Sequence, residues 1–80
     1  MMDILELIDI TPRAFAAYQA FVRRLVRALA TIDKITPEEI PDEQAKEQED
    51  GSLLVWIDLP QGKRVEFVIP KGDWAWHNRN

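Results

Sequence analysis

Cysteine is missing from this chain of 80 residues, and histidine occurs only once. The lack of cysteine excludes disulfide bonds, thiolate zinc sites and thiol nucleophiles. No apolar run approaches the roughly 20 residues that span a bilayer. The first residues show no signal-peptide pattern either. We therefore expect a cytoplasmic protein that has no contact with membranes.

Groupings of residues that could carry catalysis are also scarce. Ser52 is the only serine, and it is far in sequence from the only histidine, His77, so a nucleophile–base pair is not expected. Asp73 and His77 would supply only two of the ligands that a metal site needs. The three glycines are about ten residues apart, and each suits a turn rather than a phosphate-binding loop. We predict a protein that is not an enzyme and holds no cofactor or metal.

The net charge of −4 is distributed unevenly along the chain. Residues 11–35 carry a net charge of +4, whereas residues 36–52 carry −6. Arg23, Arg24 and Arg27 would share one arc of a helix. Because a basic block lies between acidic ones, we expect residues 38–50 to fold over these arginines and neutralise them. The alternative is that the three arginines bind the phosphates of a nucleic acid.

A long amphipathic helix is predicted over residues 11–35. Thr11 would cap it, and Pro12 suits the first helical position. The apolar positions that follow are spaced alternately by three and four residues: Phe15, Tyr18, Val22, Leu25, Leu29 and Ile32. This stripe would pack on the protein's own sheet. Because one hairpin offers little apolar surface, part of the stripe could instead pair with a second copy, giving a homodimer.

The segments on either side of this helix have weaker patterns. Apolar positions within residues 1–10 favour a short helix. In the acidic connector, residues 36–51, Thr36 and Glu39 fit a capping box, and Pro41 limits that helix to about one turn. Residues 42–50 would be a solvated connector, either mobile or forming two exposed helical turns. The alternative is a docking surface for a basic partner.

An antiparallel β-hairpin is predicted over residues 52–70. Pro60, Gln61 and Gly62 separate two runs of strand-forming residues and suit a type I turn closed by a glycine bulge. The resulting register pairs Leu59 with Lys63 and sets Asp58 opposite Arg64. One hairpin face is then wholly apolar.

The other hairpin face carries Leu54, Trp56 and Val68. We expect the N-terminal segment or the tail to cover it; uncovered, it would be a contact site. Residues 71–80 form a tail in which Trp74 and Trp76 would share one face of an extended strand. These two tryptophans are expected to fold back over the hairpin, or else to anchor another protein.

Together these patterns predict a small single α+β domain over residues 1–80, with the long helix packed on a C-terminal antiparallel β-hairpin. The expected function is that of a protein–protein interaction module, such as an adaptor, small subunit or inhibitor, steered by acidic charge toward its partner. The predicted partner-binding residues are Leu54, Trp56, Val68, Trp74, Trp76, Arg79, Glu43 and Glu47. The alternative is a dimeric nucleic-acid-associated regulator that uses Arg23, Arg24 and Arg27.

Overall fold

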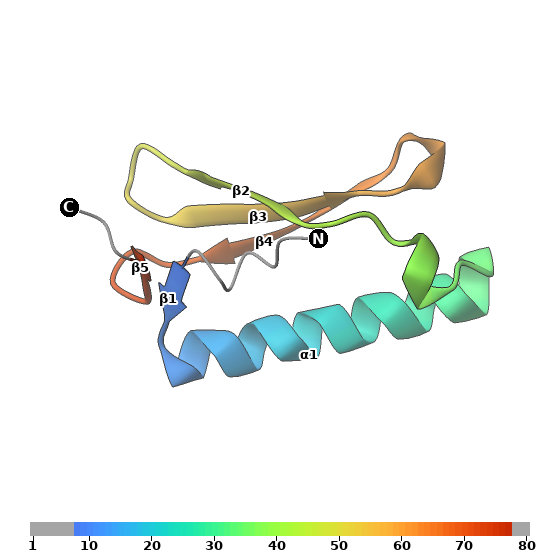
Figure 1. The fold of residues 1–80 in the computed structure, drawn as a ribbon, viewed down its shortest axis with the longest axis horizontal. Coiled ribbons are helices and arrows are strands. Elements are labelled where there is room, and N and C mark those ends of the chain that lie inside the picture. Colours follow the sequence, from blue (N-terminus) through green and yellow to red (C-terminus); the bar gives the residue numbers. More distant parts are fainter. Residues whose placement is uncertain (1–7, 78–80) are drawn as a thin grey trace.

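The computed structural model describes residues 8–77 and has two layers, a long helix and a β-sheet (Figure 1). The elements are β1 (Ile8–Ile10), α1 (Pro12–Ala28), β2 (Gln44–Glu47), β3 (Leu53–Asp58), β4 (Arg64–Ile69) and β5 (Trp74–Trp76). Strands β2, β3 and β4 form an antiparallel sheet in that order, and β1 pairs with β5 in a separate ribbon. The predicted α+β class is confirmed.

Helix α1 begins as the sequence predicts. The Thr11 hydroxyl oxygen accepts a hydrogen bond from the Ala14 amide at 3.3 Å, and Pro12 occupies the first helical position. The regular helix ends earlier than predicted, because a π-helical turn, Leu29–Asp33, follows it and Lys34 adopts a left-handed conformation with φ of 56°.

This wider turn rotates the end of the apolar stripe away from the sheet. Leu29 is buried, but Ile32 is 75% exposed. The prediction that Ile32 packs with the rest of the stripe is therefore wrong.

The β3–β4 hairpin has the predicted register. Leu53 pairs with Ile69, and Asp58 pairs with Arg64 at the other end. The Leu59 amide donates to the Lys63 carbonyl at 2.7 Å and closes the loop. The loop itself is the 3-10 turn Pro60–Gly62, in which Gly62 has a φ of 76°.

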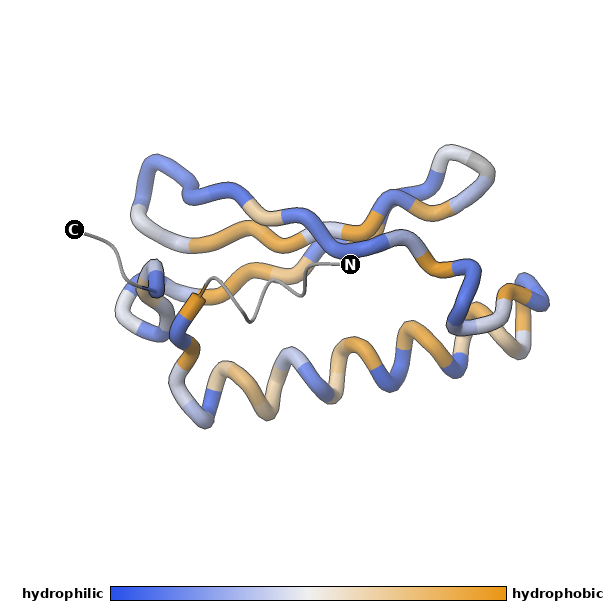
Figure 2. The backbone as a smooth tube through the Cα atoms, in the orientation of Figure 1, coloured by the Kyte–Doolittle hydropathy of each residue, from blue (hydrophilic) through white to orange (hydrophobic). Residues whose placement is uncertain are grey.

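The acidic connector contains a strand, which the sequence did not predict. Gln44–Glu47 runs antiparallel to β3, with Ala45 opposite Val55. The predicted helical or mobile form is wrong there, because main-chain pairing satisfies the open edge of β3 without any large apolar side chain. The side chains of β2 are nevertheless mostly exposed to solvent, as expected. In Figure 2 this strand is mostly hydrophilic, whereas β3 and β4 are largely apolar.

The turn before β2 is short, as predicted, but its cap is different. It spans Pro37–Glu39 as a 3-10 turn. The Thr36 side chain makes no capping hydrogen bond. Instead, the Glu39 amide donates to the Thr36 main-chain carbonyl at 3.0 Å. The predicted capping box is therefore wrong, because a turn this tight is closed by its own backbone.

The predicted N-terminal helix over residues 1–10 is wrong for residues 8–10, and its remainder lies outside the described residues. Ile8 pairs with Trp76, and Ile10 pairs with Trp74. The tail therefore supplies the pairing partner that turns this apolar segment into a strand. Ile8 is 3% exposed as a result.

The core lies between α1 and one face of the sheet, in two clusters. The first contains the buried residues Ile8, Ala14, Tyr18, Leu53, Val55 and Ile69. The second contains Leu29, Ile35, Ile57 and Leu59 near the end of the helix. Every β3 residue in these clusters has an odd number, so strand alternation turns the even-numbered β3 residues to the opposite face.

Candidate binding surfaces

The structure divides the predicted partner-binding residues between two places. Leu54, Trp56 and Val68 share the sheet face that is turned away from α1, which we call the outer face. Trp74, Trp76 and Glu47 gather at one end of the molecule, beside β1. Glu43 is half-buried just before β2, and Arg79 lies outside the described residues.

The outer face has an apolar centre and a polar rim. Val68 is 49% exposed, while Leu54 and Trp56 are half-buried. The rim residues in register with them are Lys46, Gln44, Glu66, Arg64 and Asp58. Helix α1 and the tail tryptophans pack on the opposite face, so no element within residues 8–77 covers the outer face. The expected cover by the N-terminal segment or the tail is absent for residues 8–10 and 71–77, which pair with each other or pack on the core side, and the remainder of both segments lies outside the described residues.

Trp56 is held in place by its charged neighbours. The guanidinium carbon of Arg64 lies 5.2 Å from the centre of the indole ring. The same side chain donates from Nε to Asp58 Oδ1 at 2.7 Å, and Gln44 donates to the other oxygen of Asp58 at 3.5 Å. The Trp56 indole nitrogen is shielded and has no hydrogen-bond partner. The ring is thus presented in a fixed orientation at the centre of the outer face.

The two tail tryptophans fold back on the hairpin, as expected. The Trp74 indole donates to the Gly51 carbonyl at 2.9 Å, and the Trp76 indole donates to Glu47 Oε1 at 3.3 Å. Their rings meet edge to face, with centres 5.2 Å apart, and pack against the first core cluster. Their remaining surface lines a shallow hollow of about 410 Å³ together with Glu47 and Lys71.

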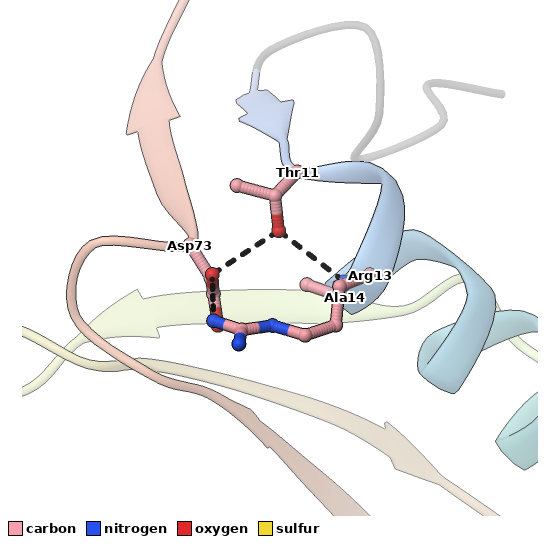
Figure 3. Close-up of polar contacts among 4 residues, drawn as sticks. All are labelled: Thr11, Arg13, Ala14 and Asp73. Carbon is pink, nitrogen blue, oxygen red and sulfur yellow. Dashed lines mark hydrogen bonds and ion pairs between the residues drawn. The ribbon is translucent and has the colours of Figure 1, made fainter.

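A buried carboxylate ties this tail to the start of α1 (Figure 3). Asp73 is 7% exposed, and its two oxygens accept hydrogen bonds from Arg13 Nη2 at 2.8 and 3.1 Å. The Thr11 hydroxyl donates to Asp73 Oδ1 at 3.2 Å. The hydrogen bond from Arg13, and then that from Thr11, lower the pKa of Asp73 against the opposing effect of burial. The ionised Asp73 carboxylate therefore has a structural role, because it links the tail to the start of α1.

Asp50 has a similar structural role in the β2–β3 loop. Its Oδ1 accepts hydrogen bonds from the Ser52 hydroxyl at 2.6 Å and from the Ser52 amide at 2.9 Å. These bonds lower the pKa of Asp50. The Ser52 hydroxyl also accepts a hydrogen bond from the Gln48 side chain at 2.9 Å, so both its donor and its acceptor capacity are engaged in the loop.

Arg23, Arg24 and Arg27 form a third surface, which we call the arginine face. At about 100° per residue, they point away from Tyr18 and hence away from the sheet. All three are exposed, and they border a shallow hollow of about 320 Å³ over Ala20.

The arginine face is not neutralised by residues 36–52, which we call the acidic segment. The ion pairs within residues 8–77 join Arg13 to Asp73 and Arg64 to Asp58, and a further contact joins the His77 ring to Asp9. The expectation that residues 38–50 neutralise the arginines is wrong, because none of these ion pairs joins Arg23, Arg24 or Arg27 to an acidic residue.

The remaining chemistry of the described residues is limited. His77 Nδ1 lies 3.1 Å from Asp9 Oδ1, and within residues 8–77 no three acidic or histidine side chains gather to hold a metal ion. In the same part of the chain, no helix combines the length and the apolar character needed to cross a bilayer.

Comparisons with protein-family models, with curated proteins and with solved structures give no match to this chain. The function must therefore be inferred from the surfaces themselves. Two of them combine exposure with a chemistry that the fold does not use: the outer face and the arginine face.

Proposed function

We propose that this protein is a protein–protein interaction module, acting as an adaptor, small subunit or inhibitor, and that its outer face contacts the partner. The observation that carries the proposal is the apolar centre formed by Leu54, Trp56 and Val68, which no element within residues 8–77 covers. An apolar group of this kind within a polar rim is typical of a binding surface.

The arrangement suits the way in which binding energy is concentrated in interfaces. Tryptophan and arginine are the side chains most often found at energetic centres, and here Arg64 lies over Trp56. The rim carries both signs of charge, with Lys46 and Arg64 on one hand and Asp58 and Glu66 on the other. We infer a partner with an apolar surface that receives these side chains, surrounded by charges of both signs.

The sequence predicts three tryptophans, Trp56, Trp74 and Trp76, as contacts to the partner. Of these, we expect Trp56 to contribute most of the binding energy. The indole N–H groups of Trp74 and Trp76 already donate hydrogen bonds within the protein, and part of each ring packs against the core. Glu43 and Glu47 belong to the acidic segment, whose charge of −6 supplies long-range attraction for a basic partner. Steering of this kind raises the association rate more than the affinity.

The test is affinity capture from a lysate of the native source, with nuclease present, using the wild-type protein and two matched variants. Val68→Asp introduces a charge into the outer face, and Ile32→Asp makes the same change at an exposed aliphatic residue elsewhere. We expect the wild type and Ile32→Asp to retain the same protein in stoichiometric amount and Val68→Asp to lose it. Equal capture by both variants, with both folded by circular dichroism, would refute the proposal.

A further inference from the structure

We propose that the arginine face binds the phosphodiester backbone of a nucleic acid, independently of the contact made by the outer face. The proposal rests on three exposed guanidinium groups that share one side of α1 and enter no ion pair within residues 8–77.

The first argument is the separation of charge within the molecule. The chain has an excess of acidic residues, and the segment 36–52 alone carries −6. This charge would neutralise the arginines if it paired with them, yet no acidic residue within residues 8–77 forms an ion pair with any of the three. A concentrated positive surface on an acidic protein draws a polyanion in one orientation.

The second argument is the shape of the surface. Ala20 and the three arginines alone line the hollow, so a small side chain lies between long cationic ones. A phosphate group can therefore approach the helix closely while guanidinium groups reach it from the sides. Arginine is suited to this role, because its planar group donates two parallel hydrogen bonds to phosphate oxygens.

The third argument concerns the kind of anion. Arg23 and Arg27 are separated by about 6 Å along the helix axis, and phosphates recur about every 3.4 Å of axis along each strand of a duplex. Guanidinium groups spread over this length can contact more than one phosphate of a strand, whereas one small anion would engage only part of the arginine face. Contacts to phosphates carry no information on base sequence, so we expect binding through this hollow to be independent of base sequence.

The experiment measures fluorescence anisotropy of a labelled duplex DNA and of a labelled single-stranded RNA, titrated with the protein at several salt concentrations. The test variant carries Arg23→Gln, Arg24→Gln and Arg27→Gln. The matched control carries Lys46→Gln, Lys63→Gln and Lys71→Gln, which removes the same charge from exposed residues elsewhere. Thermal melting followed by circular dichroism establishes that both variants fold.

We expect saturable binding by the wild type at low salt. With three phosphate contacts on duplex DNA, a fourfold rise in salt should weaken binding by about 40-fold, from a slope of about −0.9 per contact. The arginine variant should lose at least tenfold in affinity and most of its salt dependence, while the lysine control stays close to the wild type.

Three results would overturn the proposal. One is the absence of saturable binding to either nucleic acid at low salt. Another is an equal loss of affinity in the arginine variant and the lysine control, which would indicate a nonspecific effect of net charge. The third is binding to vesicles of anionic lipid that depends on the arginines while neither nucleic acid is bound. Because Val68→Asp leaves the arginine face intact, it should bind nucleic acid normally even if the outer face has no partner.

Discussion

At the scale of single residues, Asp73 joins the two ends of the described chain. Its side chain receives hydrogen bonds from Arg13 and Thr11, and its main-chain carbonyl accepts from the Thr11 amide at 2.9 Å. Thr11 is also the cap of α1. One carboxylate therefore helps to fix the start of the helix and the position of the tail tryptophans together.

Asp73 gives the stability of the protein a specific dependence on pH. Because its pKa is lowered by folding, its stabilising effect is complete above the pKa of the unfolded chain and is lost as the pH falls through the lower, folded pKa. Asp73→Asn should therefore lower the melting temperature at neutral pH. The difference from the wild type should shrink in acid, below the ordinary aspartate value of 3.8.

The measurement is the melting temperature of the wild type and of Asp73→Asn between neutral pH and about pH 2, a range that covers the titration of aspartate. Asp42→Asn removes the same charge from an exposed residue and should differ little from the wild type at any pH. A difference between the wild type and Asp73→Asn that stays constant over the whole range would contradict this assignment.

At the scale of elements, α1 and the β3–β4 hairpin could be predicted because their signals are local. The cap at Thr11 and the loop ending in Gly62 lie within a few residues of the structures that they start or close. The register of the hairpin then placed Leu54, Trp56 and Val68 on one face, and this placement is confirmed. The residues of the outer face could therefore be predicted from local sequence spacing alone, without any tertiary contact.

Strands β1, β2 and β5 could not be predicted in the same way. Strand β2 places only Ala45 against the core, so its sequence lacks the alternation of apolar and polar residues that normally predicts a strand. Strands β1 and β5 form only because they pair with each other, although they lie near opposite ends of the sequence, with Ile8 opposite Trp76.

The π-helical turn, Leu29–Asp33, gives a direct test of where the apolar stripe leaves the core. Leu29 is 4% exposed and Ile32 is 75% exposed. Leu29→Ala should lower the free energy of unfolding by about 2–4 kcal/mol, as expected for a buried leucine. Ile32→Ala should change it by less than about 0.5 kcal/mol. Urea denaturation measures both, and equal losses would mean that Ile32 packs in the core after all.

At the scale of the whole molecule, the helix and the sheet leave charge and apolar surface in separate places. The arginine face lies on the side of α1 opposite the core, and the outer face lies on the far side of the sheet. A ligand on one of these surfaces does not block another. If both proposals hold, the molecule joins a nucleic acid to a protein, which would unite the two functions that the sequence left as alternatives.

The predicted homodimer through α1 belongs to this scale, because it would duplicate the arginine face. Phe15, Val22 and Val26 are only half-buried on one flank of the helix, and Phe15 and Val22 border a shallow hollow of about 250 Å³. Pairing of two such flanks would bury apolar surface that the small sheet does not fully cover. We therefore expect the molecular mass to rise from 9.3 kDa toward twice that value with concentration.

Sedimentation velocity from low micromolar to millimolar concentration measures this equilibrium. Val26→Glu should remain monomeric, whereas Ala17→Glu, an equivalent change at an exposed position of α1, should associate like the wild type. A mass of 9.3 kDa at every concentration would exclude the dimer. Because a dimer carries two arginine faces, nucleic-acid binding by the wild type should depend more steeply on salt than binding by Val26→Glu. A shared slope would mean that each copy binds alone, even where the protein dimerises.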